Sequence, residues 1–166
     1  IHSYGDRHGQ IVVTPRGRGT STWYVSRAHQ DFFEVFDDVH NLFANIDPTR
    51  RYLSGYSMGG YGTYLFGLLY PDLFAAGYST SGALTQGAWT GVGPTGPLCD
   101  MEAFTIPGLG DGNACFIEAN NGDADAQLTW RLLENARHLP LAIHHGTTDY
   151  LVPITGLLRV GERLTG

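Results

Sequence analysis

The chain contains no lysine: its ten cationic side chains are all arginine, against sixteen aspartates and glutamates, which gives a formal net charge of −6. Without lysine, no side chain of this sequence can act as an amine nucleophile or form a Schiff base. The acidic balance leaves no basic surface of the kind that binds nucleic-acid phosphates. No apolar stretch approaches the roughly twenty residues that span a bilayer. Composition therefore excludes lysine catalysis and argues against nucleic-acid binding and a membrane span.

Cysteine is scarce as well, with Cys99 and Cys115 the two thiols of the chain. The pair could form one disulfide that staples a loop, which would fit an oxidising compartment and a secreted protein. The alternative is two free, partly buried thiols. Two cysteines without matching histidines do not make a metal-ligand set, so we expect no metal site at this pair. The localisation of the protein stays open on these residues.

The spacing of apolar residues predicts strands and helices of an α/β protein. Strands are predicted over 11–14, 51–56, 74–80 and 139–143, and helices over 58–69, 124–136 and 154–164. A further helix is predicted from apolar residues that recur at three and four positions between 32 and 43, with Asp31 and Glu34 as a capping box at its start. We expect the apolar strand 11–14 to be buried.

The segment Gly55-Tyr56-Ser57-Met58-Gly59 fits the pattern G-x-S-x-G and lies between an apolar run and a helical pattern. In that context the motif carries a nucleophile on a sharp turn from a strand into a helix, and small flanking residues permit the turn. We interpret Ser57 as the candidate catalytic nucleophile. The backbone N–H of Met58, at the start of the helix, is the candidate oxyanion donor. The alternative is a glycine-rich turn with an idle serine.

A second motif, His144-His145-Gly146-Thr147-Thr148-Asp149-Tyr150-Leu151-Val152-Pro153, follows an apolar run and presents Asp149 in the loop after a predicted strand. Together the two motifs resemble the α/β-hydrolase superfamily, particularly its prolyl-oligopeptidase-like and esterase branches. There, an H-G-x-x-D-x-x-V-P segment carries the acid of a Ser-Asp-His triad, and the acid follows the nucleophile in the chain. The resemblance implies that Asp149 is the candidate catalytic acid. The alternative is a loop aspartate that forms an Asx-turn.

Further resemblance lies at 12–19 and 70–76, so the likeness covers most of the chain outside residues 84–125. It implies a three-layer α/β-hydrolase sandwich with a mostly parallel sheet, present only in part. We assign 1–166 to one partial domain with an irregular, lid-like insertion at about 84–125.

The triad histidine is absent from the sequence as given. In the resembled family it follows the acid by a few tens of residues, but no histidine lies between Tyr150 and Gly166, and the seven histidines all precede Asp149. The resemblance implies a structural strand-end role for His145, and we interpret His144 as a hydrogen-bonded structural residue as well. It also implies an earlier strand that carries a second oxyanion donor, for which nothing before Ile11 can serve. We therefore expect the base and this donor to come from the remainder of the same polypeptide or from a complementing chain.

The resemblance implies a serine hydrolase, an esterase or a peptidase of the prolyl-oligopeptidase-like kind. It would act on a small-molecule ester or a peptide through an acyl-enzyme on Ser57, with a histidine from outside the given chain as base. This chemistry needs no cofactor. One alternative is a catalytically silent α/β-hydrolase-like domain that binds a partner or scaffolds an assembly. Another is an acyltransferase, which would pass the acyl group to an acceptor other than water.

Overall fold

The computed structural model describes residues 2–18, 24, 27–84, 105–106, 110–111, 132–149, 151–152 and 154–165. The chain forms two compact units, Ile1–Ala44 and Asn45–Gly166. Cys99 and Cys115 lie outside the described residues, as does almost all of the expected insertion at 84–125. The disulfide and the insertion therefore stay predictions.

The first unit contains α1 (His2–His8) and α2 (Arg27–Leu42). The strand predicted over 11–14 is wrong: these residues belong to no strand. Ile11 is 50% exposed, and Val12 and Val13 are each 42% exposed. A buried strand needs a neighbour to bond its N–H and C=O groups, and within the described ranges no strand pairs with this segment. The apolar sequence of residues 11–14 could not show that the segment lacks a neighbouring strand in the described part of the chain.

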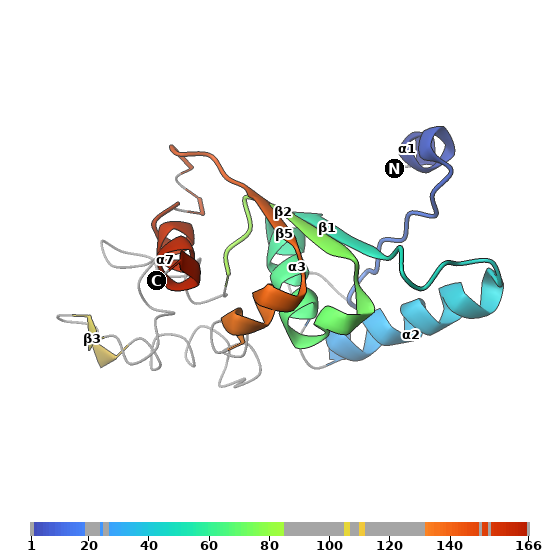
Figure 1. The fold of residues 1–166 in the computed structure, drawn as a ribbon, viewed down its shortest axis with the longest axis horizontal. Coiled ribbons are helices and arrows are strands. Elements are labelled where there is room, and N and C mark those ends of the chain that lie inside the picture. Colours follow the sequence, from blue (N-terminus) through green and yellow to red (C-terminus); the bar gives the residue numbers. More distant parts are fainter. Residues whose placement is uncertain are drawn as a thin grey trace. The chain divides into compact units, whose positions relative to one another are not determined.

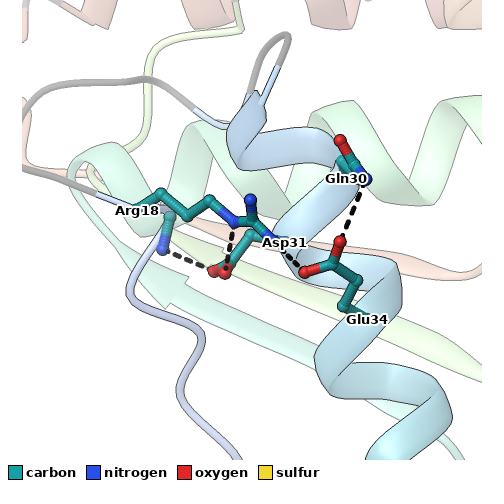
Figure 2. Close-up of polar contacts among 5 residues, drawn as sticks. Arg18, Gln30, Asp31 and Glu34 are labelled. Atoms are coloured by element: carbon teal, nitrogen blue, oxygen red, sulfur yellow. Dashed lines mark hydrogen bonds and ion pairs between the residues drawn. The ribbon is translucent and has the colours of Figure 1, made fainter.

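The capping box predicted at Asp31 is also wrong, because α2 begins earlier, at Arg27. Asp31 instead holds the preceding loop: Oδ2 accepts from the Gly17 N–H at 3.0 Å and Oδ1 from Arg18 Nε at 3.2 Å (Figure 2). Arg18 Nη2 also donates to Glu34. Gly17 and Arg18 both have left-handed backbones, with φ of 61° and 54°. The Asp31 carboxylate therefore fixes this turn. The left-handed backbone is strained at Arg18, because Arg18 has a Cβ.

The second unit contains a parallel three-stranded sheet in the order β1 (Tyr52–Tyr56), β2 (Ala76–Thr80), β5 (Leu141–His144) (Figure 1). These strands confirm the ones predicted over 51–56, 74–80 and 139–143. Thr80 pairs with Tyr56 on one side and with His144 on the other. The carboxyl ends of the three strands therefore lie side by side, and the loops that follow them share one edge of the sheet.

Helix α3 (Met58–Leu69) has the predicted bounds and follows β1 directly. It packs against β1 and β2. It is buried without interruption from Gly60 to Leu68. Its apolar side chains pack with the sheet and with later helical segments in one core. The buried members of this core are Tyr64, Leu68, Leu84 and Leu133, and its partly buried members include Leu141, Ile143 and Leu157. The core thus lies under the elements that carry both predicted motifs.

Five further elements of this unit lie within the described residues. They are η1 (Pro71–Leu73), η4 (Leu133–His138), α7 (Ile154–Thr165), and an antiparallel pair of β3 (Thr105–Ile106) and β4 (Gly110–Asp111). Of the helix predicted over 124–136, the last residues, 133–136, belong to the 3-10 helix η4 and not to an α-helix. Helix α7 confirms the helix predicted over 154–164. None of the helices in the described ranges has the length and apolarity to cross a membrane.

Candidate functional site

Ser57 lies between the end of β1 and the start of α3, where the motif predicted it. Its backbone has φ 56° and ψ −117°, in the left-handed region that residues with a Cβ avoid at about 1–2 kcal/mol. Two bonds hold it there: its N–H donates to Thr80 O at 2.9 Å, and its carbonyl accepts from Tyr61 N–H at 3.1 Å. Its hydroxyl makes no capping bond to the helix. The fold therefore maintains a strained serine whose side chain takes no part in capping α3.

The two motif glycines differ in their surroundings. A Cβ on Gly55 would lie 2.1 Å from both the carbonyl carbon and the carbonyl oxygen of Gly59, so no other residue fits there without a backbone shift. A Cβ on Gly59 would meet none of the described residues within 4 Å. The tight turn thus depends sterically on the first glycine.

The N-terminus of α3 is directed at the carboxyl edge of the sheet. Met58 is the first helical residue, and the N–H groups of a first turn have no acceptor within their own helix. Together with the helix dipole, such groups favour negative charge. The role of the Met58 N–H as an oxyanion donor stays a prediction.

A second close contact joins α3 to the segment that follows β2. A Cβ on Gly60 would lie 2.7 Å from Gly82 Cα and 2.8 Å from Ser79 Oγ. The backbones of Gly60 and Gly82 therefore touch, and this contact fixes the first turn of α3 against the end of the central strand.

Asp149 lies in the loop after β5, as predicted; we call residues 145–149 and 151–152 the β5 loop. Its Oδ1 accepts from the backbone N–H groups of Leu151 at 3.0 Å and Val152 at 2.9 Å. Its own N–H donates to Gly146 O at 3.2 Å. The Asx-type turn considered as the alternative is therefore present, but it uses Oδ1, and 20% of the side chain is exposed. The turn orients the carboxylate and does not exclude a further role.

The pKa of Asp149 is lowered from its ordinary value of 3.8. The largest cause is the hydrogen bond from the Val152 N–H. Burial opposes it, and the Leu151 N–H, the nearby His145 ring and the Ser81 hydroxyl each lower the pKa further. Asp149 is therefore a carboxylate at neutral pH, the form that can orient a histidine base.

His145 is a structural residue, as predicted. Its side chain is 2% exposed, and Nε2 lies 2.6 Å from Val152 O and 3.8 Å from Asp149 Oδ2. Because a carbonyl oxygen only accepts, Nε2 carries a hydrogen and donates it to Val152. The ring thereby closes the β5 loop. His144, the last residue of β5, is exposed, and His40 on α2 has its Nδ1 2.6 Å from Phe36 O.

Backbone bonds connect the two predicted motifs across the central strand. Ser57 N–H donates to Thr80 O, and Ser81 N–H donates to His144 O at 2.9 Å. Ser57 follows β1 and Asp149 follows β5, so one strand separates them at the same edge of the sheet. The structure thus brings the two motifs to one edge, although they are distant in the sequence.

Sequence reasoning missed Ser81, which follows β2, donates its N–H to His144 O at 2.9 Å and is one of the groups that lower the pKa of Asp149. The available signal was a run of small polar residues, Ser79-Thr80-Ser81, at the carboxyl end of a predicted strand. No group of three or more His, Cys, Asp or Glu in the described part of the chain has the arrangement of a metal site.

No family model matches the chain. It is 26% identical over 163 residues to poly(3-hydroxyalkanoate) depolymerase C of Paucimonas lemoignei. This match covers 89% of this chain and 35% of the depolymerase. It is 44% identical over 62 residues to the bifunctional acetylxylan esterase/xylanase of Neocallimastix patriciarum. This match covers 36% of this chain and 9% of the esterase/xylanase.

Among solved structures, the substrate-bound fluorophosphonate-binding serine hydrolase F of Staphylococcus aureus matches 99% of this chain with a TM-score of 0.61 and 24% identity. The acylaminoacyl peptidase of Pyrococcus horikoshii matches 84% with a TM-score of 0.53 and 25% identity. The chain therefore has, in part, the fold of the α/β-hydrolase superfamily. It spans 62% of the staphylococcal chain and 21% of the archaeal one.

Proposed function

We propose that this chain is part of a serine hydrolase that cleaves an ester bond through an acyl-enzyme on Ser57. The observation that supports it most is the backbone of Ser57, a left-handed residue at a strand-to-helix turn that a glycine contact and two hydrogen bonds maintain. Strain of this kind concentrates at functional sites, and a sharp turn exposes the hydroxyl above the sheet.

An ester substrate is favoured over an amide by the named relatives. The esterase removes acetyl groups from acetylxylan by its name, and the depolymerase acts on a polyhydroxyalkanoate, which is a polyester. The peptidase likeness is a structural one alone, with a TM-score of 0.53. The resulting proposal is a carboxylic ester, for which the acyl group is small or a hydroxyacyl unit.

In the proposed reaction the Ser57 hydroxyl attacks the ester carbonyl carbon while a histidine base takes its proton. The Met58 N–H and one further donor stabilise the oxyanion. Collapse of the tetrahedral intermediate breaks the bond to the alcohol, which leaves with the proton returned by the histidine. Water then attacks the acyl-enzyme by the same path, so that Ser57 is regenerated and a carboxylic acid is released.

The proposed partnership of Ser57 and Asp149 fits the spacing of the strands. Neighbouring strands lie about 4.8 Å apart, so β1 and β5, with β2 between them, are separated by about 10 Å. An imidazole ring with a hydrogen bond of about 2.8 Å at each end can bridge side chains that rise from strands at this separation. A histidine supplied from outside residues 1–166 would occupy that place.

A second candidate function is a catalytically silent domain that binds a partner. The observation that favours it is the position of His145, the histidine nearest to Asp149 in the sequence, whose Nε2 is engaged by Val152 O of the β5 loop. On this alternative the strained serine would have no chemical role.

Turnover by the natural full-length polypeptide tests the proposal. We expect hydrolysis of p-nitrophenyl acetate to exceed that of acetyl p-nitroanilide. Ser57→Ala should abolish it, and Asp149→Asn should lower kcat about 10²- to 10⁴-fold. Two matched variants serve as controls: Ser54→Ala, a serine on β1 with an exposed side chain, and Asp47→Asn, whose Oδ1 accepts from the Thr49 N–H at 2.9 Å. Wild-type protein without turnover would favour the silent domain.

A further inference from the structure

Val152 connects the β5 loop to the segment that follows β2. Its N–H donates to Asp149 Oδ1 at 2.9 Å, and this bond is the largest cause of the lowered pKa of the acid. Its carbonyl accepts from His145 Nε2 at 2.6 Å. Its side chain is 7% exposed and packs with Ala83, which is equally buried. The backbone of Val152 is therefore bonded within the β5 loop, whereas its side chain packs outside it.

The segment that packs with Val152 lies directly against the helix that follows Ser57. Gly82 precedes Ala83, and a Cβ on Gly82 would lie 2.7 Å from Gly60 Cα. Gly60 belongs to the first turn of α3. The two backbones touch with no side chain between them, so the first turn of α3 sets the position of residues 82–83.

The packing of Val152 on Ala83 does what the hydrogen bonds of the β5 loop cannot do. The bonds from the Leu151 and Val152 N–H groups orient the Asp149 carboxylate, but both donors belong to the same loop as the acid. The side chain of Leu151 is 63% exposed and anchors nothing. The buried Val152 side chain instead joins the loop to a segment that follows another strand. It thereby fixes the carboxylate relative to the start of α3, and so relative to Ser57.

We propose that Val152 is a positioning residue, whose side chain, packed on Ala83, holds the Asp149 carboxylate in place relative to Ser57. The inference rests on the proposed serine-hydrolase function. Val152 is buried and acts through Asp149, so it does not contact the substrate. A misplacement of about 1 Å far from the reacting atoms can lower the rate about 10²-fold. Loss of the Val152 side chain should therefore lower kcat and leave KM unchanged.

The test compares Val152→Ala, Val152→Ile and Val13→Ala in the full-length polypeptide with p-nitrophenyl acetate. Val152→Ala keeps the backbone N–H and carbonyl but removes two methyl groups from the buried side chain, so kcat should fall about tenfold at unchanged KM. Val152→Ile keeps an apolar β-branched side chain and should retain a higher kcat than Val152→Ala. Val13→Ala, the matched control, removes the same methyl groups from a side chain that is 42% exposed in the first unit, and its kcat should equal that of the wild type.

A double-mutant cycle decides whether Val152 acts through the acid. In an Asp149→Ala background, Val152→Ala should cause no further loss of kcat, whereas a further loss of the same size would overturn the proposal. A side chain that only stabilises the fold would lower the urea midpoint in both backgrounds and leave the kcat of the folded protein unchanged. That result would also overturn the proposal.

Ala83→Gly tests the same contact from the other side. If Val152→Ala does not fold, a lowered kcat of Ala83→Gly at unchanged KM supports the proposal, and the wild-type kcat overturns it. Ser57→Ala separates the positioning role from the proposed function. If it abolishes turnover while Val152→Ala keeps the wild-type kcat, the role of Val152 alone is refuted. If Ser57→Ala keeps its turnover, the proposed function fails and the Val152 proposal fails with it.

Discussion

Replacing Gly55 with alanine should damage the protein far more than replacing Gly59, although both glycines belong to the same motif. The new Cβ at position 55 would lie 2.1 Å from the carbonyl carbon and oxygen of Gly59. Both are backbone atoms of the first turn of α3, so no side-chain rotation can relieve the clash. The turn itself must move, and with it Ser57.

The magnitude follows from these contacts. Overpacking of a tight site typically costs about 1–3 kcal/mol, and a clash with backbone belongs at the upper end. Alanine also has a lower conformational entropy than glycine in the unfolded chain, which offsets about 0.4–1 kcal/mol of this cost, so Gly55→Ala should be destabilised by about 2–2.6 kcal/mol. Gly59 has no described neighbour within 4 Å of its Cβ position and lies in a helix, so Gly59→Ala should gain about 0.5–1 kcal/mol.

Urea unfolding of the two variants and the wild type measures this difference as a change of midpoint at constant slope. Gly55→Ala should also lose reactivity of Ser57, because the serine moves with the turn. A Gly55→Ala protein as stable as Gly59→Ala would refute the steric reasoning and with it the geometry assigned to the turn.

Two further predictions concern the carboxylates. The pKa of Asp149 is depressed in the folded state, so its contribution to stability is present above the ordinary pKa of 3.8 and is lost as pH falls through the lower folded value. The gap in urea midpoint between wild type and Asp149→Asn should thus be constant above about pH 5 and shrink on further acidification; a gap that widens there would contradict the assignment. In the first unit, Asp31→Ala removes the acceptor of the Gly17 N–H and should cost about 1 kcal/mol in urea unfolding. Glu34→Ala, the matched control, loses bonds to exposed side chains and should change little; equal effects would refute the anchoring role of Asp31.

Much of the second unit was predictable because its signals are local. The apolar run before Ser57 and the helical pattern after it give β1 and α3, and the turn between them follows from the motif glycines. The apolar run before Asp149 gives β5 in the same way. These elements bury their apolar faces against one another, so the local pattern and the tertiary packing agree.

The failures share a non-local cause. Residues 11–14 have the composition of a strand, but a strand also needs a partner, which composition does not encode. Asp31 and Glu34 have the spacing of a capping box, but Asp31 binds a loop fourteen residues away. Ser81 donates to His144 O only because β2 and β5 are neighbours in the sheet. Each depends on pairing between distant segments.

Activation of Ser57 can be measured directly by mass spectrometry of the natural full-length polypeptide after treatment with a fluorophosphonate, which modifies serines activated by a neighbouring base. We expect one adduct, on the peptide that contains Ser57, and none on Ser57→Ala. A folded wild-type protein that gains no adduct, or gains it on another serine, would contradict the claim that Ser57 is an activated nucleophile.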